Sequence, residues 1–198
     1  MSTELITKLR EMTGAGISDC NKALKETEND IDKACQWLRE KGMASAVKRA
    51  GRSAKQGLIH SYIHGNGVLG VLVEVNCETD FVAKTDDFKE LVKEIAMQIA
   101  AVSPLYVTRE QVPQAALDAE KEIYKSQLKE EGKPEKIWDK IIEGKIEKYY
   151  AQVCLYDQIY MRDTSGKQTI KDLVNEKIGK IGENIVIKKF ARFKLGEE

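Results

Sequence analysis

The segment LGVLVEVNCETDFVAK, residues 69–84, changes its pattern halfway along and decides how the chain folds around it. Its first half carries an apolar residue at every second position, from Leu69 to Cys77, which predicts a strand buried on one face. A polar turn follows, and a large aromatic residue, Phe81, stands at its tip. Such a residue either opens the next helix as part of the core or points outward, and the local pattern leaves both interpretations open.

The residues before this segment predict a β-hairpin. The residues from Leu58 to Ile63 lead into HGNG at 64–67, where glycine and asparagine favour a tight turn. The residues after the segment predict one long helix from Phe81 to Ala101, because apolar side chains recur there at helical spacing. Pro104 is expected to end that helix, and LYV at 105–107 is compatible with a short strand.

The second half of the chain predicts more helices and a final strand. Two helical patterns at 113–131 and 134–150 are separated by EEGKP, which predicts a helical hairpin. Residues 169–180 predict a further helix, and ENIVIKKFARFKLG at 183–196 predicts a strand. One face of that strand is expected to carry Ile185, Ile187, Lys189, Ala191 and Phe193. Adjacent antiparallel strands mixed with helices indicate the α+β class.

The first part of the chain predicts three short helices between residues 3 and 42, with Thr3, Ser18 and Asp30 as N-caps. Glycines at 14, 16 and 42 are expected to end helices. Three helices in so few residues enclose a very small core, which would be marginally stable alone.

A basic stretch, MASAVKRAGRSAKQ at 43–56, predicts a connector that is helical at most at its start. No carboxylate lies between Glu40 and Glu74, whereas Lys41, just before this stretch, and Lys48, Arg49, Arg52 and Lys55 within it are cationic. We interpret it as a solvated connector, with contact to an acidic partner or RNA as the alternative. The expected domains are 1–52, three helices with the basic linker, and 53–198, an α+β core that includes the helical hairpin at 113–150.

Charge and length exclude several classes of protein. Lys+Arg and Asp+Glu both number 32 in 198 residues, and a zero net charge argues against a dedicated nucleic-acid binder. No apolar run approaches the ~20 residues that span a bilayer. The N-terminal residues lack the apolar core of a signal peptide, so we expect a cytoplasmic protein that neither spans nor binds a membrane.

No motif for catalysis, a metal or a cofactor is evident. The four cysteines, at 20, 35, 77 and 154, lie in apolar patterns without a CxxC pair and predict free buried thiols rather than a disulfide or zinc site. His60 and His64 flank the hairpin turn and match no metal motif. TGAGISD at 13–19 follows a helix and lacks the Gly-Lys-Ser/Thr of a phosphate loop. We expect a protein that binds a partner and is not an enzyme.

Two segments resemble the signature segments of the translation elongation factor Ts family: LREMTGAGISDCNKAL at 9–24 and VEVNCETDFVAK at 73–84. The similarity continues through WLREKG, KIIEGKIEKYY and the closing RFKLGE, so it covers the chain end to end. The resemblance implies an N-terminal three-helix domain of the ubiquitin-associated type and an α+β core. The length is similar to the short form of the family, which implies a homodimer.

The resemblance also implies a function, guanine-nucleotide exchange on the GTPase elongation factor Tu. The family's wedge, which dislodges magnesium so that GDP leaves, corresponds here to Thr79, Asp80, Phe81 and Val82. The family's N-terminal contact with the GTPase corresponds to Arg10, Ile17 and Ser18. For Ile17, a place in the core of its own domain is the competing interpretation.

Three positions depart from the family pattern. Asn21 stands where lysine is common, Ser18 where an apolar residue is common, and Ile159 where proline is common. A basic contact at position 21 is therefore in doubt, and a turn near Ile159 is expected to differ. A nucleic-acid- or ribosome-associated adapter that uses the three helices and the basic run remains the alternative, although that run lacks aromatic residues. An enzyme with an unrecognised site has no motif in its support.

Overall fold

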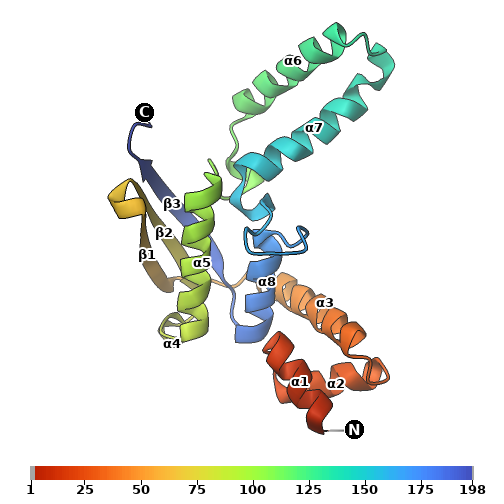
Figure 1. Ribbon diagram of the computed structural model, residues 1–198, viewed down its shortest axis with the longest axis vertical. Helices are drawn as coiled ribbons and strands as arrows, with labels where there is room; N and C mark the ends of the chain where they lie inside the picture. Colours follow the sequence, from red (N-terminus) through yellow and green to blue (C-terminus); the bar gives the residue numbers. More distant parts are fainter. Residues whose placement is uncertain (1–2, 198) are drawn as a thin grey trace. The chain divides into compact units, whose positions relative to one another are not determined.

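The computed structural model describes residues 3–197 and contains both helices and a sheet, so the predicted α+β class is confirmed (Figure 1). The helices are α1 (Thr3–Thr13), α2 (Ile17–Glu26), α3 (Ile31–Arg49), α4 (Asp80–Ala83), α5 (Asp86–Val102), α6 (Gln114–Glu130), α7 (Trp138–Val153) and α8 (Ile170–Ile181). The strands are β1 (Gln56–His64), β2 (Leu69–Cys77) and β3 (Val186–Lys194). Short 3-10 turns are η1 (Gly65–Gly67), η2 (Arg109–Gln111), η3 (Glu135–Ile137) and η4 (Leu155–Asp157).

The three strands form one sheet in the order β1-β2-β3. The turn between β1 and β2 contains Asn66 at φ 56°, a conformation that asparagine tolerates better than most residues. The end of β3 lies beside the start of β2, because the N–H of Leu195 donates to the carbonyl of Val68 at 2.9 Å. The neighbouring strands are therefore antiparallel.

Burial follows the predicted alternation closely in β2 and only partly in β3. Leu69, Val71, Val73, Val75 and Cys77 are all buried. On β3 and just before it, Ile185 and Ile187 are buried, but the later members of the same face, Lys189, Ala191 and Phe193, are exposed.

By internal contacts the chain forms two compact units, each described here by itself. The first unit comprises Met1–Ile59, Glu74–Val92 and Asp172–Ile187, and the second comprises His60–Val73, Lys93–Lys171 and Lys188–Glu198. Residue 52, the predicted domain boundary, falls inside the first unit. The boundary itself stays a prediction.

In the first unit, α1, α2 and α3 enclose the small core that the sequence predicts. Its fully buried members are Leu9, Cys20, Ala23, Leu24 and Ala34. The Asp30 side chain caps α3 by accepting from the N–H of Lys33 at 3.0 Å. Gly14 ends α1 at φ +65°, and its N–H donates to the carbonyl of Arg10 at 2.7 Å.

The prediction that Gly42 ends the third helix is wrong, because α3 continues through it to Arg49. A Cβ added to Gly179 of α8 would lie 2.8 Å from the Cα of Gly42, so the two backbones approach very closely. Gly42 therefore allows close helix contact, and the alanine-rich residues after it continue the helix. Much of the predicted connector is helical as a result.

The prediction of one long helix from Phe81 to Ala101 is also wrong, since α4 and α5 are separate helices. The break lies at Lys84 and Thr85. The hydroxyl of Thr85 donates to the carbonyl of Val82 at 2.7 Å and accepts from the N–H of Phe88 at 3.3 Å. Thr85 thus caps the new helix, a local competition that apolar spacing does not register.

In the second unit, α6 and α7 contact each other as the predicted helical hairpin. Arg109 joins the base of the hairpin to neighbouring segments, since its guanidinium donates to Asp157 at 2.8 Å and to Glu147 at 2.9–3.0 Å. Hydrogen bonds to these carboxylates raise the pKa of Arg109. Residues 105–107 form no strand; Tyr106 makes only an isolated bridge with Cys154.

Two helical glycines offer a matched test of the close contact at Gly42. We expect Gly179→Ala to lower the free energy of unfolding by about 1–3 kcal/mol, because its methyl group meets backbone that cannot rotate away. Gly144→Ala on α7 meets no atom within 4 Å, so the same change should raise that free energy by about 0.5–1 kcal/mol. Urea unfolding of both variants measures the difference, and equal shifts would contradict the close approach.

Candidate partner-binding site

The turn between β2 and α4 presents Phe81 to solvent. Thr79 is the N-cap of α4, and its hydroxyl accepts from the N–H of Val82 at 3.4 Å. Phe81 is 78% exposed, whereas Ala83 two residues later is buried. The interpretation of Phe81 as a core residue that opens its helix does not hold, because such a residue would be buried.

The residues around Phe81 differ in their exposure and charge. Thr79 and Asp80 are exposed, and Val82 is half-buried. Asp80 accepts a hydrogen bond from Lys84 at 2.6 Å, and this bond lowers the pKa of the Asp80 carboxyl. The Lys84 ammonium also lies 5.9 Å from the centre of the Phe81 ring. The turn therefore presents an apolar ring beside an exposed ion pair.

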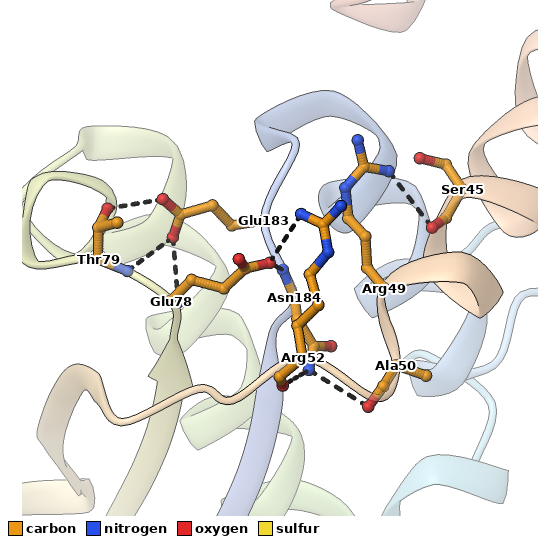
Figure 2. Close-up of polar contacts among 8 residues, drawn as sticks. All are labelled: Ser45, Arg49, Ala50, Arg52, Glu78, Thr79, Glu183 and Asn184. Carbon is orange, nitrogen blue, oxygen red and sulfur yellow. Dashed lines mark hydrogen bonds and ion pairs between the residues drawn. The ribbon is translucent and has the colours of Figure 1, made fainter.

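A carboxylate from a distant part of the chain supports this turn. Glu183, between α8 and β3, accepts from the N–H groups of Glu78 and Thr79, each at 3.0 Å, and from the Thr79 hydroxyl at 2.6 Å (Figure 2). The sequence pattern does not indicate Glu183 as part of the site. It lies 104 residues from Thr79, and a lone glutamate before a strand gives no local signal.

The predicted N-terminal contact residues lie on the surface of the three-helix core. Arg10, Ile17 and Ser18 are all exposed, and Ile17 is 58% exposed. Ile17 therefore does not fill the core of its own domain. A surface pocket of about 380 Å³ is lined by Thr3, Ile6, Thr7, Arg10, Glu11 and Ile17.

The predicted site residues thus form two groups in the first unit. Arg10 and Ile17 share the pocket, and Ser18 follows on α2. Thr79 to Val82 form the other group, at the start of α4. Each group offers an exposed apolar side chain next to charged ones, an arrangement typical of protein-binding surfaces.

Within residues 3–197, no three His, Cys, Asp or Glu side chains are grouped so that they could hold a metal ion. The four cysteines are free; Cys35 is half-buried and the others are buried. Burial raises the pKa of Cys77 and of Cys154 to about 11, so both stay thiols at neutral pH. None of the described helices is long and apolar enough to cross a membrane.

Cations in the basic run, and Lys41 just before it, have partners within the protein. Lys41 forms an ion pair with Asp19, and Arg52 lies 3.6 Å from Glu78. Arg49 donates to the carbonyl of Ser45 at 3.3 Å. Two of the cations are therefore already paired with carboxylates, which weakens this surface as a site for phosphates.

Two of the unusual positions occupy distinct surroundings. Asn21 is half-buried, and within residues 3–197 its buried Oδ1 has no hydrogen-bond partner. Ile159 is 44% exposed and forms an isolated antiparallel bridge with Thr169.

Comparison with known proteins places this geometry in context. Residues 3–197 match the family described as Elongation factor TS. A Coprothermobacter proteolyticus protein named Elongation factor Ts is 58% identical over 197 residues, which cover 100% of this chain and 99% of that protein. Proteins of the same name from Thermoanaerobacter sp. (strain X514) and Thermotoga maritima are 57% and 56% identical; the matches cover 100% of this chain and 96% and 97% of those proteins.

The exposure of Phe81 can be tested by stability alone. We expect Phe81→Ala to change the free energy of unfolding by less than about 0.5 kcal/mol, because its ring is 78% exposed. Phe88→Ala, on α5 and fully buried, should cost about 3–5 kcal/mol. Chemical unfolding compares the two; a large loss for Phe81→Ala would mean that the ring is part of the core.

Proposed function

Because this chain belongs to the elongation factor Ts family of translation factors, we propose that it is a guanine-nucleotide exchange factor for the GTPase elongation factor Tu. It binds the GDP form of the GTPase, displaces magnesium and lets GDP leave so that GTP can bind. The protein itself makes and breaks no covalent bond, and it acts in the cytoplasm, where translation takes place. The observation that most supports the proposal is a phenylalanine, Phe81, 78% exposed at the tip of a capped turn.

The wedge consists of Thr79, Asp80, Phe81 and Val82. The Phe81 ring enters the GTPase close to its magnesium site and disturbs the residues that hold the phosphates. Thr79 caps the short helix that carries the ring, and Val82 is half-buried on the inner side of that helix. Asp80, exposed and paired with Lys84, makes polar contacts beside the ring.

The size of the effect requires a broad contact in addition to the ring. Nanomolar affinity for GDP corresponds to about 12 kcal/mol. Accelerating GDP release by about 10⁴ takes a coupling of about 5.5 kcal/mol, whereas burying one phenylalanine contributes only about 2–3 kcal/mol. The rest comes from an interface on the order of 1,600 Å².

The pocket on the three-helix core supplies part of that interface. Ile17 offers an exposed apolar anchor, Arg10 a cation, and Ser18, the residue after Ile17, a hydroxyl. An apolar side chain of the GTPase that enters the pocket contacts Ile6 and Ile17 and meets charge from Arg10 and Glu11 at its rim. Two separate contacts hold the exchange factor in place while the ring acts.

Thermodynamic linkage limits how tightly the exchange factor can bind elongation factor Tu when nucleotide is bound. If the exchange factor weakens GDP binding by a given factor, GDP weakens binding of the exchange factor by the same factor. Incoming nucleotide therefore releases the exchange factor, and the cycle can repeat. No bound metal or cofactor is needed on the exchange factor itself.

We propose further that the chain forms a homodimer through the outer face of the sheet. A Cβ on Gly70 would lie 3.2 Å from the end of the Ile63 side chain, so Ile63 lies over the face of β2 that is opposite Val71 and Val73. Leu72 shares that face; Ile63 is 64% and Leu72 is 49% exposed. Exposed apolar groups gathered on one sheet face are typical of protein contacts.

The exchange proposal predicts a selective effect of one ring. We expect Phe81→Ala to slow the stimulated release of GDP from elongation factor Tu by about 30- to 150-fold, the equivalent of 2–3 kcal/mol of lost contact. Stopped-flow release of a fluorescent GDP analogue measures the rate. Phe193→Ala removes another exposed phenylalanine, 72% exposed, and should leave the rate unchanged. Equal rates for Phe81→Ala and the unsubstituted protein would refute the wedge.

The dimer proposal predicts a change of mass. In sedimentation equilibrium the unsubstituted protein should have twice the mass of one chain, and Leu72→Lys should lower it to that of one chain, because a buried unpaired charge is costly. Ile123→Lys changes a residue of α6 with similar exposure, 50%, and should leave the dimer intact. A monomer in all three samples would rule the dimer out.

A further inference from the structure

The turn that carries Phe81 is held by groups outside its own helix. The α4 helix has only four residues, too few to be stable by itself. Glu183 accepts three hydrogen bonds from the two residues that precede the helix, Glu78 and Thr79. Bonds to an ionised carboxylate are among the stronger ones in proteins. The position of the N-cap, and with it the direction of the ring, therefore depends on Glu183.

The same junction also reaches the end of α3. Glu78 accepts from the N–H of Asn184 at 2.6 Å, so the segments 78–79 and 183–184 bind each other in both directions. The Asn184 side chain, 3% exposed, donates to the carbonyls of Arg52 at 2.8 Å and Ala50 at 3.5 Å (Figure 2). Arg52 pairs in turn with Glu78 at 3.6 Å.

Three chain segments thus meet at one set of polar contacts in the first unit. One segment, 50–52, is the continuation of the three-helix core, which carries the pocket. Another segment, 78–79, precedes α4, the helix that carries the exposed Phe81 ring. The third, 183–184, joins the other two and has no exposed apolar group of its own to offer a partner.

We propose that Glu183 and Asn184 are positioning residues for nucleotide exchange: Glu183 sets the direction of the Phe81 turn, and Asn184 links that turn to the end of α3. The inference rests on the exchange function proposed above and deepens it. A ring that must enter a narrow site loses much of its effect when it is displaced by about 1 Å. Two linked contacts bind more tightly than two independently moving ones.

The two residues should affect different kinetic quantities. We expect Glu183→Ala to lower the GDP release rate at saturating exchange factor by about 10- to 100-fold, with a smaller change in the half-saturating concentration. Asn184→Asp keeps the shape but replaces the donor with an acceptor. It should raise the half-saturating concentration about tenfold and change the saturating rate less.

The experiment uses the full chain, elongation factor Tu and a fluorescent GDP analogue, over a range of exchange-factor concentrations. Glu90→Ala, an exposed carboxylate on α5 in the same unit, is the matched control and should behave like the unsubstituted protein. If Glu183→Ala does not fold, Glu183→Gln replaces it. The amide keeps one acceptor oxygen and should retain an intermediate rate.

Hydrogen exchange of the free chain gives a readout that needs no GTPase. Loss of the Glu183 carboxylate should speed exchange at the amides of residues 78–84 and leave the buried part of α5 unchanged. A loosened turn with an unchanged saturating release rate would overturn the positioning role. If the unsubstituted chain does not accelerate GDP release, the proposed exchange function is wrong, and the positioning role is wrong with it. That result differs from failure of the positioning role alone, in which the unsubstituted chain is active and Glu183→Ala is equally active.

Discussion

A helix of four residues cannot hold an exposed phenylalanine in a fixed direction by its own hydrogen bonds. In this protein the constraint is met by a carboxylate from elsewhere in the chain. Glu183 accepts hydrogen bonds from two backbone N–H groups and the hydroxyl at the start of the turn, and the Glu78 carboxylate accepts one from the N–H of Asn184. Because these bonds join residues 104–106 positions apart in the sequence, the site forms only when the first unit is folded. The exposed turn that carries Phe81 therefore depends on the tertiary structure, as a hydrophobic core does.

The three-helix core depends on the rest of its unit in a similar way. Its buried residues are few and mostly small, so it gains little from burial alone. Close approach of α3 and α8 at Gly42 and Gly179, with an ion pair between Arg39 and Asp172 at 3.6 Å, extends the contact area. The pair is partly exposed and contributes at most about 1 kcal/mol, so backbone proximity is the larger effect. Both proposed partner contacts thus belong to one packed unit.

Local pattern predicted most of the elements but missed several boundaries, including the N-cap of α2, which is Gly16 and not Ser18. Alternation in β2, turn chemistry before it and helical spacing in the hairpin all depend on neighbours within a few residues. The helix end predicted at Gly42 is wrong because glycine serves both to end a helix and to permit close contact, and only the position of Gly179 distinguishes these roles. The single helix predicted across residues 84–85 failed because Thr85 forms a cap without interrupting the apolar spacing.

The sequence by itself determined the fold class, the family and Phe81 as the candidate ring, because these follow from alternation, spacing and two long motifs. It could not determine whether Phe81 was buried, since a hydrophobic residue at a turn can be either buried in the core or exposed to solvent, depending on its surroundings. Only the tertiary structure decided that the ring is exposed and that Glu183 and Asn184 hold its turn. The physical reason is the sequence separation over which each effect acts. Propensity acts over one or two helical turns, whereas this junction joins residues that only the folded topology brings within hydrogen-bond distance.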